Sequence, residues 1–286
     1  MVKKYFCTKK ANIMISIITA VHNQLAMNRL FVESLHKYSN MPFELIIIDN
    51  ASTDGSADFF EQAGAKVIRN HQNFSYPYTQ NQGIKIATGD VFAFLNNDII
   101  VCPNWDKLLL ETLQVNALDL VTSCGIEQVE NKQASILLRR KWNYAKNFVN
   151  LFPTSGTSLK LMHKLMYGNW EKFCQSRNQR FHNQVKEGFV GHSVFCTRRA
   201  LDLIGLWDEK LQAADFDIYM RSKKRNLEYG DIKPCHIALN IFNHHYIRLT
   251  VRSKPVPFAD AANIIKFEDK WSETERKTLL KDIELI

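Results

Sequence analysis

The chain has 286 residues, 45% of them hydrophobic and 23% charged, which is typical of a globular protein with a proper core. Its 37 basic residues exceed its 29 acidic ones, and the net charge of +8 favours anionic partners such as sugar nucleotides, phospholipid surfaces or nucleic acid. No window reaches the roughly 18 consecutive apolar residues needed to cross a bilayer, and the start of the chain does not resemble a secretory signal.

The cysteines are scattered through the chain and include no C-x-x-C pair. They are Cys7, Cys102, Cys124, Cys174, Cys196 and Cys235. This spacing predicts reduced thiols in a cytoplasmic protein, without a zinc site or a disulfide framework. No nucleic-acid recognition motif accompanies the positive charge, so we expect no nucleic-acid partner.

The first 125 residues alternate strand and helix patterns. The predicted strands are 13–20, 43–48, 65–69, 91–95 and 118–124, and the predicted helices are 25–38, a short one through Phe59 and Phe60, 78–87 and 104–116. Strands joined by helices are typical of an α/β fold, so this half predicts a mostly parallel sheet flanked by helices.

The pattern breaks between residues 126 and 186, which we interpret as an insertion. Residues 132–150 are basic and aromatic, and 159–173 has helical spacing. The basic stretch contains Arg139, Arg140, Lys141, Trp142, Tyr144 and Lys146. Such a segment could contact a phosphorylated or lipid-linked acceptor or an anionic membrane, or it could be a solvated helix whose aromatics pack on the sheet.

Regular elements resume near residue 188. The pattern predicts a strand at 188–197, helices at 198–204 and 215–225, an extended stretch at 228–245 and a charged, amphipathic helical tail at 259–286.

Polar residues follow three of the predicted parallel strands. They are Thr19 to Asn23, Asp49 to Ser52, and Asn96-Asn97-Asp98. Since the carboxyl ends of parallel strands meet at one edge, these residues predict a crevice for a polar ligand. A single carboxylate there suits Mg²⁺ or Mn²⁺ shared with a diphosphate. Neither G-x-G-x-x-G nor G-K-[ST] is present.

These motifs resemble those of the inverting GT-A glycosyltransferases of family 2. The matching text is ISIITAVHNQ (15–24), IIIDNASTDGS (46–56), Asn73 with Asn81-Gln82-Gly83, ATGDVFAFLNNDI (87–99) and EGFVGHSVFCTRRALDLIGLWDE (187–209). The resemblance is strong over 13–125, weaker over 187–250, and absent from the insertion and the tail. It implies one Rossmann-like GT-A domain over 1–286, with a nucleotide-sugar-binding half (13–125), a helical insertion (126–186), an acceptor-binding half (187–250) and a helical tail (251–286).

The resemblance also implies roles for single residues on the donor side. The residues expected around the donor are Thr19, Ala20, His22, Asn23, Asp49, Ser52, Asn73, Asn81, Asn96 and Asn97. Asp49 would accept a hydrogen bond from the base, because an ionised carboxylate is only an acceptor. Asp98, the one carboxylate where the family has D-x-D, would hold Mn²⁺ or Mg²⁺.

On the acceptor side, the resemblance makes Asp215 the catalytic base, although the preceding acid of the family pattern is Ala214 here. Asp217 and Arg221, four residues apart, are expected to form a structural pair. A late histidine would reach the metal, and we expect His244 rather than His245, since neighbours on a strand face opposite ways.

The predicted activity is metal-assisted, inverting transfer of a sugar from a nucleotide-sugar donor to a hydroxyl of a glycan, glycolipid or protein. A UDP-sugar is the first choice, with dTDP- and GDP-sugars open. Two alternatives are a catalytically inactive GT-A module that binds a sugar nucleotide or a partner, and a nucleotidyltransferase. Residues 132–150 leave peripheral contact with the inner membrane face open.

Overall fold

A single large sheet forms the centre of the computed structural model, which describes residues 13–149, 155–247 and 256–283. Its strand order is β3-β2-β1-β4-β8-β6-β9-β7. The strands are β1 (Ile15–Val21), β2 (Phe43–Asn50), β3 (Lys66–Asn70), β4 (Val91–Leu95), β6 (Leu120–Cys124), β7 (Val185–Glu187), β8 (Ser193–Thr197) and β9 (His236–Phe242). A separate two-stranded sheet pairs β5 (Ile99–Ile100) with β10 (His244–His245).

The predicted α/β class is confirmed, and the sheet is mixed, with more parallel than antiparallel pairings. Four pairings in the large sheet are parallel: β1–β2, β1–β4, β2–β3 and β6–β9. Three are antiparallel: β4–β8, β6–β8 and β7–β9. The strand β8 is buried throughout, so its apolar run has no alternation that could have indicated its position between β4 and β6.

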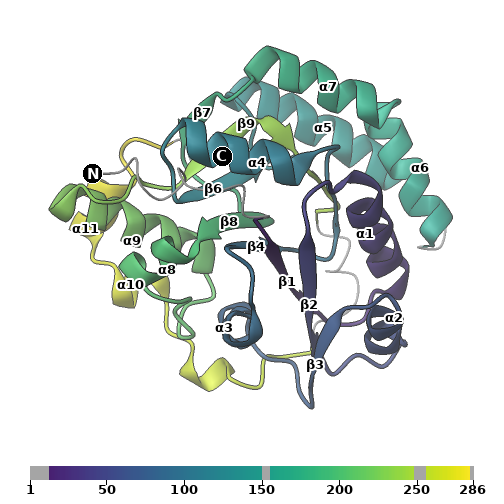
Figure 1. Ribbon diagram of the computed structural model, residues 1–286, viewed down its shortest axis with the longest axis horizontal. Helices are drawn as coiled ribbons and strands as arrows, with labels where there is room; N and C mark the ends of the chain where they lie inside the picture. Colours follow the sequence, from purple (N-terminus) through teal and green to yellow (C-terminus); the bar gives the residue numbers. More distant parts are fainter. Residues whose placement is uncertain (1–12, 150–154, 248–255, 284–286) are drawn as a thin grey trace.

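Helices cover both faces of this sheet (Figure 1). They are α1 (Leu25–Tyr38), α2 (Ser56–Gln62), α3 (Tyr76–Ile86), α4 (Trp105–Val115), α5 (Lys132–Val149), α6 (Gly156–Tyr167), α7 (Trp170–Phe181), α8 (Arg198–Ile204), α9 (Ala214–Tyr229), α10 (Phe267–Lys270) and α11 (Glu273–Leu279). Alternate residues of β1 face opposite cores: Ile17 belongs to the core that includes residues of α1 and α4 to α7, and Ile18 belongs to the core that includes residues of α8 and α9.

Several element boundaries differ from the sequence prediction for local reasons. The helix expected over 159–173 is divided into α6 and α7 at Gly168, whose φ is +64°, and the side chain of Asn169 caps α7. The stretch expected to be extended from residue 228 begins as the last turn of α9, which ends at Gly230 with φ +65°. The tail is broken at Trp271-Ser272, where Ser272 starts α11 with a capping box.

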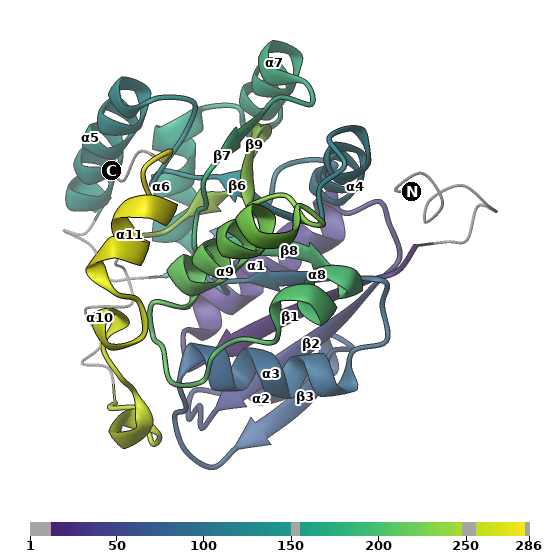
Figure 2. The same cartoon turned by 90° about the vertical axis from the view of Figure 1, so that its left-hand side faces the viewer.

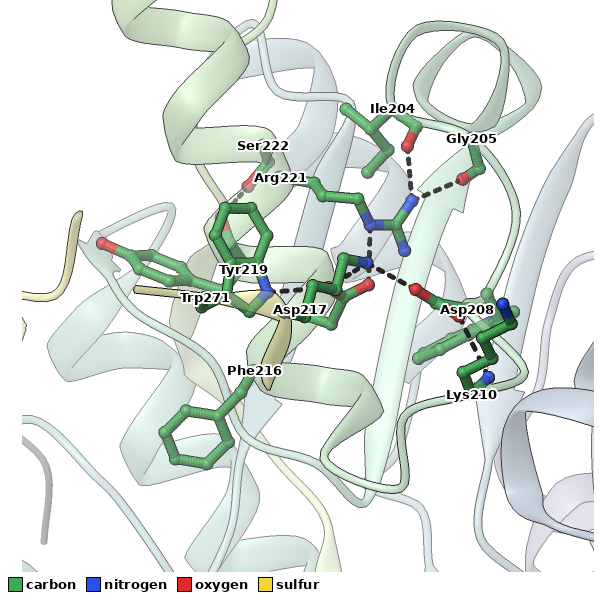
Figure 3. A network of polar contacts seen from close by, with 12 residues as sticks. Ile204, Gly205, Asp208, Lys210, Phe216, Asp217, Tyr219, Arg221, Ser222 and Trp271 are labelled. Carbon is green, nitrogen blue, oxygen red and sulfur yellow. Dashed lines mark hydrogen bonds and ion pairs between the residues drawn. The ribbon is translucent and has the colours of Figure 1, made fainter. Parts of the chain in front are cut away.

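The C-terminal segment, residues 256–283, is held to α9 and to the loop before it by partly buried charges. The carboxylate of Asp217 lies 2.7 Å from Arg221 Nε and 2.7 Å from Lys270 Nζ, and it accepts a hydrogen bond from Trp271 Nε1 at 2.9 Å. Figure 3 shows the contacts with Arg221 and Trp271. Lys270 also lies 2.6 Å from Asp208. The expected pair of Asp217 and Arg221 is therefore present, and it fastens the tail to α9.

No helix in the described parts of the chain has the length and apolar character needed to span a membrane. The cysteines within those parts are free and buried, and Cys7 lies outside the described residues.

Candidate active site at the carboxyl edge of the sheet

The polar strand ends meet at one edge because β1, β2 and β4 run parallel in close register. Val21 at the end of β1 lies opposite Asp49 on β2, and Ile18 lies opposite Phe94 on β4. The residues that follow these positions therefore emerge side by side, where ligands bind in open α/β sheets.

Asp49 has the burial and the free acceptor expected of a base-recognising carboxylate. It is buried, and its Oδ2 accepts a hydrogen bond from Ser52 N at 3.2 Å. Its other oxygen, Oδ1, and the hydroxyl of Thr19 are buried without a hydrogen-bond partner among the described residues. Because buried acceptors are normally satisfied, these atoms mark this part of the edge as suited to a polar ligand. Ala20 follows Thr19 on β1 and is half-buried.

Hydrogen bonds tie the loops after β1 and β2 together. The backbone N–H of Asn23 donates to Ser52 Oγ at 2.7 Å, and the N–H of Thr53 donates to Asn23 Oδ1 at 2.8 Å. His22 Nδ1 lies 2.7 Å from the carbonyl oxygen of Asn50. Asn23 and Ala51 both have φ of +58°, a strained conformation for residues with a side chain. Such strain clusters at functional sites, and here it turns both loops toward the crevice.

The two asparagines before Asp98 have different surroundings. Asn97 donates through its side-chain amide to Asn28 Oδ1 at 2.7 Å, which fixes the loop to α1. Asn96 is half-buried, and its backbone N–H donates to His192 O at 3.0 Å. Asn97 is thus engaged by the protein itself, while the Asn96 side chain remains a candidate for donor contact.

Asn73 and Asn81 make contacts that point to structural roles. Asn73 donates to the carbonyl oxygen of Val256 at 2.8 Å. Asn81 is buried, donates to Trp207 O at 2.9 Å and Glu209 Oε1 at 2.8 Å, and accepts from Trp207 N at 3.1 Å. Both amides therefore hold distant segments of the chain together, and donor contact by either residue stays a prediction.

A cluster of acidic and imidazole groups surrounds Asp98. The pairing of β5 with β10 sets His245 opposite Ile99, and this brings His245 Nε2 to 3.1 Å from Asp98 Oδ1. His245 Nδ1 contacts Glu127 Oε1, and His192 Nδ1 lies 3.5 Å from Glu127 Oε2. One ligand atom each of Glu127, His192 and His245 lie within 4.8 Å of one another, so these residues could hold a metal ion.

The charges in this cluster are strongly coupled. Burial lowers the pKa of His245, but the carboxylates of Asp98 and Glu127 outweigh it and hold that pKa well above its usual value. Burial likewise raises the pKa of Glu127, and the neighbouring His245 and His192 outweigh it, so the pKa lies well below its usual value. The described residues thus favour the ionised form of the Glu127 carboxylate.

The prediction for His244 needs correction. Its Nδ1 lies 2.6 Å from His163 Nδ1, and its ring stacks on Tyr246 and meets the edge of Trp142. Burial is the main cause that lowers its pKa well below the usual value. Since successive side chains of a strand point to opposite faces, placing His245 on Asp98 turns His244 into the core.

Asp215 lies at the start of α9, close to Gly191, the residue before His192. Its Oδ1 accepts the backbone N–H of Phe216 at 3.0 Å, and a methyl group on Gly191 would overlap its Oδ2. Burial raises the pKa of Asp215, and the negative charge of Glu127 raises it further. Ala214, which replaces the acid of the family pattern, is buried in the core.

Comparison with known proteins agrees with this geometry. The family model described as glycosyl transferase family 2 matches residues 16–202. The chain belongs to glycosyl transferase family 2. An uncharacterized glycosyltransferase of Rickettsia typhi is 24% identical over 160 residues, which cover 54% of this chain and 48% of that protein. Glycosyltransferase GlyG of Streptococcus pneumoniae is 23% identical over 144 residues, which cover 49% of this chain and 42% of that protein. The chain thus matches less than half the length of these relatives.

The crystal structure of S. aureus TarS resembles the chain with a TM-score of 0.50 and 14% sequence identity, covering 80% of this chain and 36% of that one. This likeness concerns the fold, and it agrees with the GT-A class expected from the motifs.

Sequence reasoning missed two members of the cluster in this family 2 chain, Glu127 and His192. Each follows a glycine that the site requires: a methyl group on Gly125 would overlap both His192 and Glu127, and Gly191 borders Asp215. The signal was therefore a glycine just after β6 and another just before β8, each within two residues of a potential ligand.

Proposed function

We propose that this chain is an inverting glycosyltransferase that moves a sugar from a nucleotide-sugar donor, a UDP-sugar by first choice, to a hydroxyl acceptor. The observation that carries the proposal is the grouping of Asp98, Glu127, His192 and His245 with Asp215 at the carboxyl edge of a family 2 sheet. The two alternatives, an inactive binding module and a nucleotidyltransferase, are not favoured by the family match.

The nucleotide would bind between the ends of β1 and β2. Asp49 Oδ1, buried and without a partner among the described residues, suits an N–H of the base. The loops of His22, Asn23 and Ser52, already tied to each other, would form the rim with no large rearrangement.

A divalent cation fits the cluster around Asp98. Asp98 and His245, with Glu127 and His192, would hold it, and a mixed oxygen and imidazole set suits Mn²⁺ better than Mg²⁺, which prefers oxygen ligands. A bound cation would neutralise the negative charge that develops on the departing diphosphate.

Asp215 would act as the general base. Its carboxylate takes the proton of the acceptor hydroxyl, the hydroxyl oxygen bonds to the anomeric carbon, and the bond from that carbon to the diphosphate oxygen breaks on the opposite side. One displacement of this kind inverts the anomeric configuration. Burial and Glu127 raise the pKa of Asp215, which makes it a stronger base than an exposed aspartate.

A thermal-shift panel of UDP-, GDP- and dTDP-sugars with and without Mn²⁺ tests the proposal. One of the three classes of sugar nucleotide should raise the unfolding midpoint in the presence of Mn²⁺, because a ligand that binds the native state stabilises that state by mass action. His245→Ala should lose the Mn²⁺-dependent part of this shift. His71→Ala, a change at an exposed histidine, is the control and should retain it.

If no sugar nucleotide shifts the midpoint with or without Mn²⁺, the donor site is refuted. A shift with no turnover by the wild-type protein would instead support the inactive binding module.

A further inference from the structure

The solvent-facing side of α5 carries several large apolar side chains. Tyr144 is 79% exposed, Phe148 57% and Leu137 56%, and Ile136 is exposed as well. At about 100° per residue, these four side chains and Arg140 fall on one face of the helix. The opposite face, with Trp142, Ala145 and Val149, is buried against the protein. We call the exposed set, Ile136, Leu137, Arg140, Tyr144 and Phe148, the α5 patch.

The neighbouring helix α6, which packs against α5, has the same character. Leu161 and Leu165, one turn apart, are both exposed. Of the thirteen large apolar side chains that are exposed within the described residues, six lie on these two helices. Exposed apolar residues that gather in one place mark a surface that contacts something else, whereas single ones do not.

The charge on these helices has one sign. Neither α5 nor α6 contains an aspartate or glutamate, and together they carry Lys132, Arg139, Arg140, Lys141, Lys146, Lys160 and Lys164. Part of this charge is used internally, because Arg139 donates to the Glu127 carbonyl oxygen at 2.9 Å and Lys160 pairs with Glu33 at 2.8 Å. Arg140, Lys132 and Lys164 are exposed.

The patch lies beside the candidate active site. The bond from Arg139 to Glu127 joins α5 directly to the segment that supplies a cluster ligand. In Figure 2, α5, α6 and α10 lie on the left, the side toward which the β3 arrow points and on which the carboxyl ends of the parallel strands emerge. The helix that carries the α5 patch therefore lies on the side of the molecule where the crevice is expected to open.

We propose that the α5 patch docks on an anionic lipid bilayer. A helix with aromatic and aliphatic side chains, basic residues and no acidic ones on its exposed side matches an interfacial helix, whose apolar groups enter the headgroup region while its cations meet lipid phosphates. The exposed surface differs from the basic and aromatic cluster expected from the sequence. Trp142 is buried and Arg139 is bound to a backbone carbonyl, whereas Ile136, Leu137 and Phe148 are exposed.

Sedimentation with vesicles of phosphatidylcholine, with and without phosphatidylglycerol, tests this surface directly, and it needs no turnover, so its outcome is independent of the proposed function. The wild-type protein should bind only the anionic vesicles, and less in high salt. Tyr144→Ser with Phe148→Ser should weaken binding by about tenfold or more, since two exposed aromatic groups are lost. Arg140→Glu should weaken it by about tenfold.

The matched control is Leu227→Ser with Tyr229→Ser, two exposed apolar residues near the far end of α9. This control should bind vesicles like the wild-type protein, and circular dichroism should show that all variants are folded. Failure of the wild-type protein to bind anionic vesicles overturns the proposal. Equal loss in the control pair also overturns it, because binding would then depend on general hydrophobicity rather than on the α5 patch.

Discussion

Asp215 and Asp217 lie two residues apart at the start of α9, and the same substitution should affect them in opposite ways. The carboxylate of Asp217 is buried and neutralises Arg221 and Lys270 while accepting from Trp271. In Asp217→Asn, Arg221 would lose its carboxylate partner, and Lys270 would keep its contact with Asp208. Asp215, in contrast, lies close to Gly191, the residue before His192, and no cation is bonded to it in the described structure.

The magnitude for Asp217 follows from these contacts. Removing one partner of a buried ion pair costs about 3–5 kcal/mol. Lys270 is partly exposed and also contacts Asp208, so the lower value, about 3 kcal/mol, is the better expectation. At about 2–4 °C for each kcal/mol, the unfolding midpoint should fall by about 6–12 °C. The C-terminal segment should also become more sensitive to limited proteolysis, because Lys270 and Trp271 help to hold it on α9.

For Asp215→Asn we expect lost sugar transfer without lost stability. The pKa of Asp215 is raised in the folded protein, so at neutral pH the ionised form is less favourable there than in the unfolded chain. Replacing it with a neutral amide should leave the midpoint unchanged or raise it, while sugar transfer falls by roughly 10²–10⁴-fold.

Calorimetry and a transfer assay on both variants complete this comparison. A stable, inactive Asp217→Asn together with an active Asp215→Asn would refute the reasoning and exchange the two roles.

Three other changes give distinct results. Gly125→Ala should weaken Mn²⁺ binding by about tenfold or more in calorimetric titration, because its methyl group would overlap two cluster residues; Gly156→Ala, with open space around it, should not. Asp49→Asn should weaken nucleotide binding by about tenfold or more, since a hydrogen bond to a charged group is lost, and equal affinity would remove Asp49 from the site. The acid limb of the kcat/KM profile should lie above the ordinary aspartate pKa of about 3.9, because protonation of Asp215 stops proton transfer; a limb at or below that value would contradict its role.

Local chemistry explains which parts of the fold could be predicted from the sequence. The helices α1 and α8 have the predicted bounds, and β4 was recognised from its apolar run between Gly89-Asp90 and Asn96. The positions of Asp49 and Asp98 also followed from parallel strands, because Asp49 lies near the end of β2 and Asp98 follows shortly after β4, in the half with regular βαβ spacing.

The rest of the site depends on long-range pairing that no local pattern contains. Glu127 and His192 meet because β8 inserts antiparallel between β4 and β6. The choice of His245 over His244 rests on the register of a two-residue strand, where a shift of one residue reverses every side chain. Asn81 matched a donor-binding motif, yet it bonds to Trp207, which lies 126 residues further along the chain.

The most direct test of a metal-assisted sugar transferase is the release of nucleoside diphosphate from the sugar nucleotide that binds in the thermal-shift panel. With Mn²⁺ present, the wild-type protein should release the diphosphate, faster when the correct acceptor is added, and His245→Ala should release it far more slowly, since it lacks the imidazole beside Asp98. Release by His245→Ala at the wild-type rate, or equal release in Mn²⁺ and in chelator, would contradict the assignment of the cluster.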